Sequence, residues 1–175
     1  MIDFVNTLDI DAGTDALATP NGVAAWFAEE RLSTGTATRV SAADRISALR
    51  LREALRDLML ANNGDSAGER SGHELEHAAR RGDLGVHFAP GGAISLEPGA
   101  GGFPGALAQL LVPVAHALSD GTWHRVKACR ASDCHWAFYD RSRNRSGVWC
   151  EMAVCGNRTK VRAYRERTPS GRDRG

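Results

Sequence analysis

The sequence lacks any long apolar run: nothing in its 175 residues approaches the ~18 consecutive apolar residues of a membrane-spanning helix. Its first stretch, MIDFVNTLDIDAG, also lacks the basic n-region and the long apolar h-region of a secretory signal peptide. We therefore expect no membrane association and a cytoplasmic location. In such a reducing compartment, clustered cysteines hold a metal more often than they form disulfides.

Motifs of the common enzyme classes are missing as well. The chain has no G-x-S-x-G nucleophile elbow, phosphate-binding loop, dinucleotide fingerprint or H-E-x-x-H metalloprotease signature. It also lacks the His-x-Glu and Pro-Cys-x-x-Cys pair of a zinc deaminase. With 42% hydrophobic and 25% charged residues, the composition is that of an ordinary globular protein. We predict that the protein is not an enzyme and has no catalytic residue.

Cysteine is scarce and unevenly placed. All four cysteines lie in one window, in the pattern Cys129-x4-Cys134-x15-Cys150-x4-Cys155. Two close pairs with such a spacer are typical of a tetrahedral Zn²⁺ site. Because four protein ligands leave no open position for chemistry, we predict one structural Zn²⁺. Two disulfides, in any of three connectivities, are the alternative, and His124 or His135 could replace one cysteine as a ligand.

The spacer between the cysteine pairs predicts a β-hairpin. In HWAFYD, Trp136 and Phe138 stand at alternate positions after Cys134 and so share a face with it. RSRNRSG is the predicted tip of the hairpin, and VWC is the predicted returning strand. Burial of Trp136, Phe138 and Trp149 would not by itself stabilise so small a module, so the metal has to supply the rest.

Helical spacing of apolar residues dominates the first 120 positions. Thr19 and Pro20 predict the N-cap and the first residue of one helix, and Ser41 with Asp44 predicts a capping box on a longer helix. The apolar positions of these two helices are Val23, Trp26, Phe27, Ile46, Leu49, Leu55 and Leu58. Acidic residues of the longer helix could pair with its arginines Arg50, Arg52 and Arg56.

Three more elements are expected before residue 121. Ser71 is predicted to cap a helix, with Glu74 three residues further on. Two short alternating runs around Pro90 predict a β-hairpin. Residues 103–121 return to helical spacing, and Pro113 predicts a kink or a break within them. The buried face of this last helix is expected to hold Leu107, Leu110, Leu111, Val114 and Leu118.

A formal net charge of +1 hides an uneven distribution. Residues 1–120 carry 9 Lys+Arg and 16 Asp+Glu, a net charge of −7, whereas residues 121–175 carry 13 and 5, a net charge of +8. Such a split indicates different roles, with the basic part meeting a polyanion. The alternative is that the two parts attract each other or a second subunit.

The chain after Cys155 predicts a basic helix. Val161, Tyr164 and Thr168 fall close to one line on it and would dock on the zinc hairpin. Its N-terminus would point backbone N–H groups at the metal thiolates, with Arg158 and Lys160 stabilising their negative charge. Together with the hairpin tip, this helix predicts a phosphate-binding surface. The candidate nucleic-acid-binding residues are Arg141, Arg143, Arg145, Arg158, Lys160, Arg162, Arg165 and Arg167.

The N-terminal part says less about function. Asp3, Asn6 and Thr7 could bind a ligand, but such residues more often cap a helix or bridge buried backbone, and we expect the latter. In a regulator this part would sense a small molecule or mediate dimerisation. A homodimer would suit a palindromic DNA site.

Two stretches of the sequence resemble a known pair of domains. SRNRSGVWCEMAVCGNRTKVRAYRER resembles the CGNR zinc finger, whose four name-giving residues are Cys155 to Arg158. DFVNT, from Asp3 to Thr7, with the helices and hairpin that follow, resembles the ABATE domain that precedes this finger. The resemblance implies a bacterial family of stress-induced transcription regulators, and with it DNA binding.

We therefore predict an α+β protein in two parts. A predominantly helical, ABATE-like domain with a small β-hairpin occupies residues 1–120. A treble-clef-like, CGNR-type zinc finger of a β-hairpin and a helix occupies residues 121–170, and a disordered tail residues 171–175. The predicted function is zinc-dependent DNA binding in a stress-responsive transcription regulator. The alternative is an RNA-binding or protein-interaction zinc module without direct DNA binding.

Overall fold

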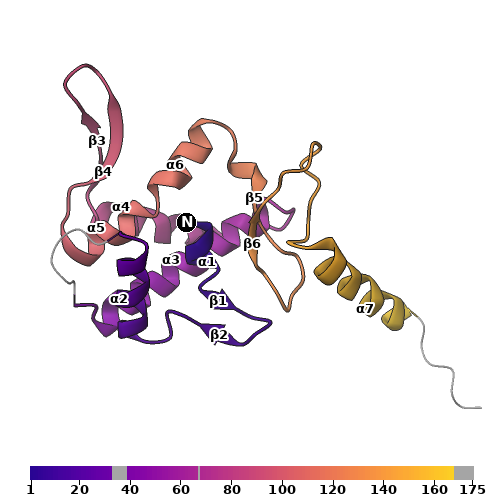
Figure 1. Ribbon diagram of the computed structural model, residues 1–175. Helices are drawn as coiled ribbons and strands as arrows, with labels where there is room; N and C mark the ends of the chain where they lie inside the picture. The colour runs from indigo at the N-terminus through magenta and orange to yellow at the C-terminus, as the bar shows by residue number, and fades with distance from the viewer. Residues whose placement is uncertain (33–38, 67, 168–175) are drawn as a thin grey trace, which may run out of the picture.

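The computed structural model describes residues 1–32, 39–66 and 68–167 (Figure 1). Its α-helices are α1 Ile2–Val5, α2 Pro20–Glu29, α3 Ala42–Ala61, α4 Glu69–Arg81, α5 Gly102–Gln109, α6 Val112–Ser119 and α7 Asn157–Arg167. A 3-10 turn spans Trp123–Arg125 and a π-helical turn spans Met152–Gly156. The strands form three antiparallel pairs: β1 Leu8–Asp9 with β2 Thr14–Asp15, β3 Leu84–Phe88 with β4 Ile94–Pro98, and β5 Val126–Ala128 with β6 Ala137–Tyr139. The predicted α+β class is confirmed, whereas Thr168 and the predicted tail lie outside the described residues.

Helix α3 runs through the centre of the molecule (Figure 1). Its capping box forms as predicted: Ser41 Oγ accepts from the Asp44 N–H at 3.1 Å, and Asp44 accepts from the Ser41 N–H at 3.0 Å. Helix α2 also begins as predicted, with Thr19 accepting from the Gly22 N–H. The core between these helices is apolar, with the rings of Phe4, Trp26, Phe27 and Phe103 in contact at centroid distances of 5.1 to 6.1 Å.

Three local predictions were wrong. Ser71 does not cap α4: it lies inside the helix and is buried, where its hydroxyl bonds the Asp57 carboxylate at 2.5 Å. Asp57 instead accepts from the Gly68 N–H at the helix start. Ile46 and Leu118 are exposed, because each lies on the side of its helix that faces away from the shared core.

Arg52 and Arg56 on α3 are buried, which sequence periodicity did not predict. Both pair with Glu53 of their own helix, as expected. Arg52 also pairs with Asp15 at 2.6 Å, and Arg56 donates to the carbonyls of Val5 and His135, both at 2.8 Å. Because buried guanidinium groups need such partners, these two arginines fix the N-terminal segment and the cysteine region to α3.

Residues 102–119 form two helices rather than one. The chain breaks at Leu110 and Leu111, and Pro113 lies in the first turn of α6, where its missing N–H costs nothing. By length and composition alone Gly102–Ser119 could cross a membrane, but half of it is buried in the protein. Most of its apolar side chains, from Phe103 to Val114, belong to the central core, which is the behaviour of a core element.

The strands beside the cysteines share that same core. Val126, Ala128 and Ala137 are buried in one cluster with Leu51, Leu55 and the other core residues of the N-terminal helices. The predicted pairing of HWAFYD with VWC was wrong: β6 pairs with β5, which precedes the first cysteine. The first cysteine pair is therefore the turn of this hairpin, and Val148 instead accepts through its carbonyl from the Arg130 N–H at 3.1 Å.

Candidate metal centre and basic surface

The first cysteine pair lies in the turn between β5 and β6. The Cys129 N–H donates to the Trp136 carbonyl at 2.9 Å, which closes the turn, and the Cys134 N–H donates to the Ala131 carbonyl at 2.9 Å. His135 has a positive φ of 52°, so the backbone reverses directly after Cys134. This tight turn places the two side chains on the same side.

The second pair is held by the π-helical turn that leads into α7. The Cys155 N–H donates to the Glu151 carbonyl at 2.9 Å, so Cys155 lies one turn before the helix. Gly156 follows, and a side chain there would collide with Met152 and Trp149. Trp136 and Trp149 pack against the cysteine cluster, but they and Phe138 are only half-buried, whereas the sequence predicted all three to be buried.

The four cysteine sulfurs converge on one point. They lie within 4.8 Å of one another, with 3.6 Å between Cys134 and Cys150 and between Cys150 and Cys155. Four sulfurs at ~2.3 Å from one zinc ion would be ~3.8 Å apart. The set therefore fits a tetrahedral ion, and the four cysteines are positioned to bind one structural Zn²⁺. All four are free thiols, and neither His124 nor His135 belongs to the set, so these alternatives are not needed.

Burial and the close approach of the thiols shift the pKa values of Cys129, Cys134 and Cys150. Burial raises the pKa of Cys134 to about 12 and raises that of Cys150 further. At Cys129 burial acts in the same direction, but backbone hydrogen bonds from Cys150 and Ala131 lower its pKa overall. Four thiolates this close repel one another, and a divalent cation is the group that lets all four ionise together.

A buried ion pair shapes the loop between β6 and the second cysteine pair. Lys127 and Asp140 are both buried and lie 2.8 Å apart. Asp140 also accepts from the N–H groups of Ser142 and Gly147, and Lys127 donates to the carbonyls of Arg145 and Gly147. A side chain at Gly147 would touch the Asp140 carboxylate, which explains a glycine here. Sequence reasoning missed Lys127, although a lysine between two strand residues that face the core is a signal for a buried partner.

Asparagines of the N-terminal part bind the backbone of the cysteine region. Asn6 exchanges two hydrogen bonds with Ala137. Asn62 donates to the carbonyls of Trp123 and Val126, and Asn63 to those of Ala128 and Val148. Thr7 donates to the Phe4 carbonyl. Asn6 and Thr7 thus bridge backbone, as the sequence led us to expect.

Two of the predicted basic residues are engaged within the protein. Arg158 lies 2.8 Å from Asp11, 3.4 Å from Asp133 and 3.8 Å from the Cys155 sulfur. The hydrogen bond to Asp11 raises its pKa. Arg162 pairs with Asp133 at 2.8 Å. Arg158 therefore stands beside the metal centre, as expected from the sequence, whereas Lys160 is exposed and has no partner among the described residues.

Helix α7 does not dock on the hairpin as predicted. Val161 and Tyr164 are 48% and 65% exposed, and no residue of the helix is buried. Its first two turns contact the turn that holds the first cysteine pair through Arg158 and Arg162, and its C-terminal end runs out into solvent (Figure 1). The six other predicted cations are exposed, and within the described ranges none of them pairs with a carboxylate: Arg141, Arg143, Arg145, Lys160, Arg165 and Arg167.

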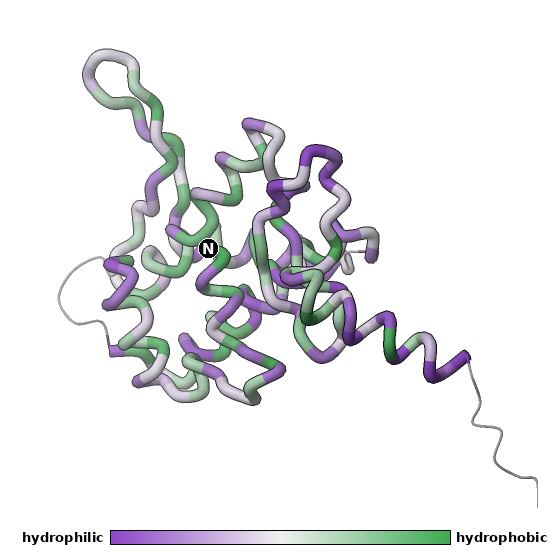
Figure 2. The backbone as a smooth tube through the Cα atoms, turned by 45° about the vertical axis from the view of Figure 1, so that its right-hand side comes forward, coloured by the Kyte–Doolittle hydropathy of each residue, from purple (hydrophilic) through white to green (hydrophobic). Residues whose placement is uncertain are grey.

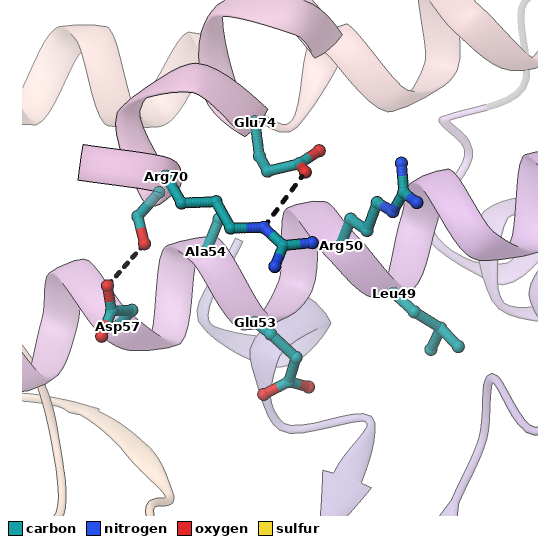
Figure 3. Close-up of a pocket in the computed structure, with 8 residues that line it drawn as sticks. Leu49, Arg50, Glu53, Ala54, Asp57, Arg70 and Glu74 are labelled. Atoms are coloured by element: carbon teal, nitrogen blue, oxygen red, sulfur yellow. Dashed lines mark hydrogen bonds and ion pairs between the residues drawn. The ribbon is translucent and has the colours of Figure 1, made fainter. Parts of the chain in front are cut away.

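The N-terminal part carries a groove of about 480 Å³ between α3 and α4 (Figure 3). Most of its polar groups are engaged within the protein: Asp57 with Ser71, Arg70 with Glu74 at 3.9 Å, and Glu53 with the buried arginines of α3. Of these contacts, Asp57 with Ser71 joins α3 to α4, whereas the others lie within a single helix, and Arg50 has no partner among the described residues.

Comparison with protein families matches both parts of the chain. The CGNR zinc finger model matches residues 125–168, and the ABATE model, described as "Putative stress-induced transcription regulator", matches residues 1–121. No curated protein matches the chain. Since the second match covers more than half of the 175 residues, the chain belongs to the ABATE family of regulators and carries a CGNR zinc finger behind that domain.

Proposed function

We propose that the protein is a DNA-binding transcription regulator whose finger depends on one structural zinc ion. The zinc ligands are Cys129, Cys134, Cys150 and Cys155. The DNA contacts come from the exposed cations of α7 and of the loop at residues 141–147. A regulator of this kind acts in the cytoplasm and does no catalysis.

The single observation that carries the proposal is the isolation of α7. A helix with no buried side chain gains little from the rest of the protein beyond the ion pairs of Arg158 and Arg162 in its first two turns. Lys160, Arg165 and Arg167 stand on it without carboxylate partners among the described residues. A cationic helix that projects from the body of the protein is suited to enter the major groove of DNA.

The zinc site would set the orientation of α7 and would not itself contact DNA. Cys155 fixes the turn before α7, and Arg158 and Arg162 tie the first two turns to Asp11 and Asp133. These ion pairs remove Arg158 and Arg162 from the phosphate-binding set that we expected from the sequence. We therefore assign the phosphate contacts to Lys160, Arg165, Arg167 and the three loop arginines, and orientation of α7 to Arg158 and Arg162.

Protein docking is the second candidate, because Val161 and Tyr164 are exposed on the same helix. An apolar stripe of this kind is what a helix presents to the groove of a partner. Such binding depends on apolar burial and changes little with salt, unlike phosphate contacts. Binding to RNA would depend on salt as binding to DNA does, so a direct competition experiment is needed to distinguish the two nucleic acids.

The test is a titration of the zinc-loaded chain into labelled random duplex DNA at several salt concentrations. Six phosphate contacts would give a slope of log affinity against log salt of about −5, and the variant Lys160→Ala/Arg165→Ala/Arg167→Ala would lose roughly half of it. The control variant Arg39→Ala/Arg50→Ala, with exposed arginines far from α7, should keep the full slope. No binding at low salt, or a slope near zero, would overturn the proposal, and structured RNA as competitor would separate the two nucleic acids.

A further inference from the structure

The hairpin β3–β4 has one face made entirely of apolar side chains. Its register pairs Leu84 with Pro98, Val86 with Leu96 and Phe88 with Ile94, and these six residues share one face because neighbours alternate. The opposite face carries Gly85, His87, Ser95 and Glu97. Leu84 packs against the core at the base of the hairpin, so only the base is anchored.

The outer part of this apolar face is open to solvent. Val86, Phe88 and Ile94 are 54%, 74% and 66% exposed, and the hairpin stands out from the body of the molecule (Figure 1). Figure 2 shows hydrophobic residues along its strands where it leaves the body. A two-stranded hairpin is marginally stable without a packing partner, so this face lacks the cover that such an element normally needs.

The scarcity of charged residues in the hairpin is typical of a buried segment. Residues 84–98 contain no lysine or arginine and a single carboxylate, Glu97, in a chain with 25% charged residues. Exposed edge strands are normally protected by charged side chains, above all lysine. Depletion of charge is instead the composition of the centre of a protein interface.

A groove of about 380 Å³ lies beside the apolar face, between β4 and α6. Ile94, Ser95 and Leu96 form one wall. The other wall is formed by Ala115, His116, Ser119 and Asp120. Leu118, on the same helix, is 59% exposed. A projecting hairpin and a receptive groove therefore lie next to each other on one molecule.

We propose that this surface is a homodimer interface, in which the hairpin of each copy lies in the groove between hairpin and α6 of the other. A two-fold contact uses the same patch on both subunits, and a patch that contains both a projection and a groove can match itself. His116 of α6 and Asp120 at its C-cap line the groove, so an imidazole of one copy and a carboxylate of the other can face each other across the axis.

The available area is sufficient for a stable dimer. Val86, Phe88, Ile94 and Leu118 each expose on the order of 100 Å² of apolar surface, or about 800 Å² for two copies. Because interfaces are about 57% apolar, this corresponds to roughly 1,400 Å² in total. That lies within the range of about 1,200 to 2,000 Å² for specific protein–protein interfaces.

The mass of the zinc-loaded full chain in solution, measured by sedimentation equilibrium over a concentration series, tests the proposal. We expect a dimer, and we expect Phe88→Lys and Ile94→Lys each to weaken it by ~30-fold or more, as loss of a central apolar anchor does. Both side chains are exposed in the single chain, so folding and zinc content should not change. Ile46→Lys, at an exposed apolar position of α3 outside this surface, is the matched control and should remain dimeric.

The outcomes are distinct. A monomer at every concentration up to about 100 µM, far above a micromolar dissociation constant, would overturn the proposal. So would a dimer that persists in Phe88→Lys and Ile94→Lys, because it would use another surface. Neither result depends on DNA binding, so failure of this interface and failure of the proposed function can be told apart.

Discussion

Asn6 and Ala137 exchange two hydrogen bonds across 131 positions of sequence. Asn6 Nδ2 donates to the Ala137 carbonyl at 3.0 Å, and the Ala137 N–H donates to Asn6 Oδ1 at 2.7 Å. The side-chain amide thus pairs with strand β6 as a neighbouring strand would. Since the β5–β6 hairpin has only two strands, these bonds supply partners that it otherwise lacks. They join the ABATE domain to the metal-binding turn.

We predict that Asn6→Ala destabilises the chain by about 1–3 kcal/mol, because both backbone groups of Ala137 lose a part-buried partner. Urea denaturation of the zinc-loaded protein measures the change. The control is Asn157→Ala, where the amide is exposed and donates only to the Ala153 carbonyl of the preceding π-helical turn. Its effect should stay within about 0.5 kcal/mol. Equal effects of the two substitutions would contradict the prediction.

The pair Lys127–Asp140 leads to a second prediction. Lys127→Met leaves a buried carboxylate without its cation and should cost about 3–5 kcal/mol, which thermal denaturation can measure. Arg80→Ala removes an exposed pair with Glu76 of similar distance and should cost less than about 1 kcal/mol. The double variant Lys127→Met/Asp140→Leu should recover part of the lost stability. If its loss of stability equalled the sum of the losses in the two single variants, Lys127 and Asp140 would not be coupled.

Asp140 also predicts how stability changes with pH. Burial alone would raise its pKa, but hydrogen bonds from Lys127, Ser142 and Gly147 outweigh burial and hold the pKa well below the usual range. A carboxylate whose pKa is lowered in the folded state stabilises the protein above its unfolded pKa of ~3.9, and this contribution is lost as pH falls below that value.

The measurement is the free energy of unfolding from about pH 6 to pH 3 in wild type and Asp140→Asn. In Asp140→Asn the free energy of unfolding should change less steeply with pH in the acid part of this range. The metal thiolates also take up protons in acid, so both proteins are compared with the same zinc content. Identical slopes would exclude Asp140 as the source.

Removal of zinc should affect more than the finger. We expect one zinc per chain by elemental analysis, and loss of it in Cys150→Ser or after chelation. Because Ala128 and Ala137 lie in the same core as Leu51 and Leu55, the ABATE helices should also lose stability. Thermal unfolding followed by far-ultraviolet circular dichroism reports on those helices. Ser146→Ala, an exposed position in the nearby loop, is the control, and an unchanged helix transition without zinc would contradict the shared core.

Arg158 and Arg165 lie two turns apart on α7 and should behave differently. Arg165→Ala should weaken DNA binding and reduce the salt slope by about 1 unit, as expected for a phosphate contact. Arg158→Ala should instead lower zinc retention, because Arg158 is held by Asp11 and Asp133 beside Cys155. Zinc release to a chromogenic chelator compares the two variants. If Arg158→Ala changed only the salt slope, the assignment of Arg158 to the metal centre would be wrong.

The sequence by itself determined the local features of this protein. Helix starts such as Thr19 and Ser41, the break near Pro113 and the turn around Pro90 depend on side chains that bond or constrain their own backbone. The four cysteines were equally clear, because thiolate pairs at such spacing serve few purposes besides metal binding. Family resemblance added the division into ABATE domain and CGNR finger.

Only the tertiary structure decided which distant groups meet. The contacts of Arg52 with Asp15, of Arg56 with His135 and of Asn6 with Ala137 join residues far apart in sequence. The pairing of β6 with β5 instead of Val148–Cys150 and the burial of Lys127 depend on which segments pack beside the core. The apolar stripe of α7 has the spacing of a docked helix, although its Val161 and Tyr164 are exposed in the part of the chain that the structure describes. Periodicity reports which side chains share a face, but the partner of that face, and the carboxylates that engage Arg158 and Arg162, depend on how the whole chain packs.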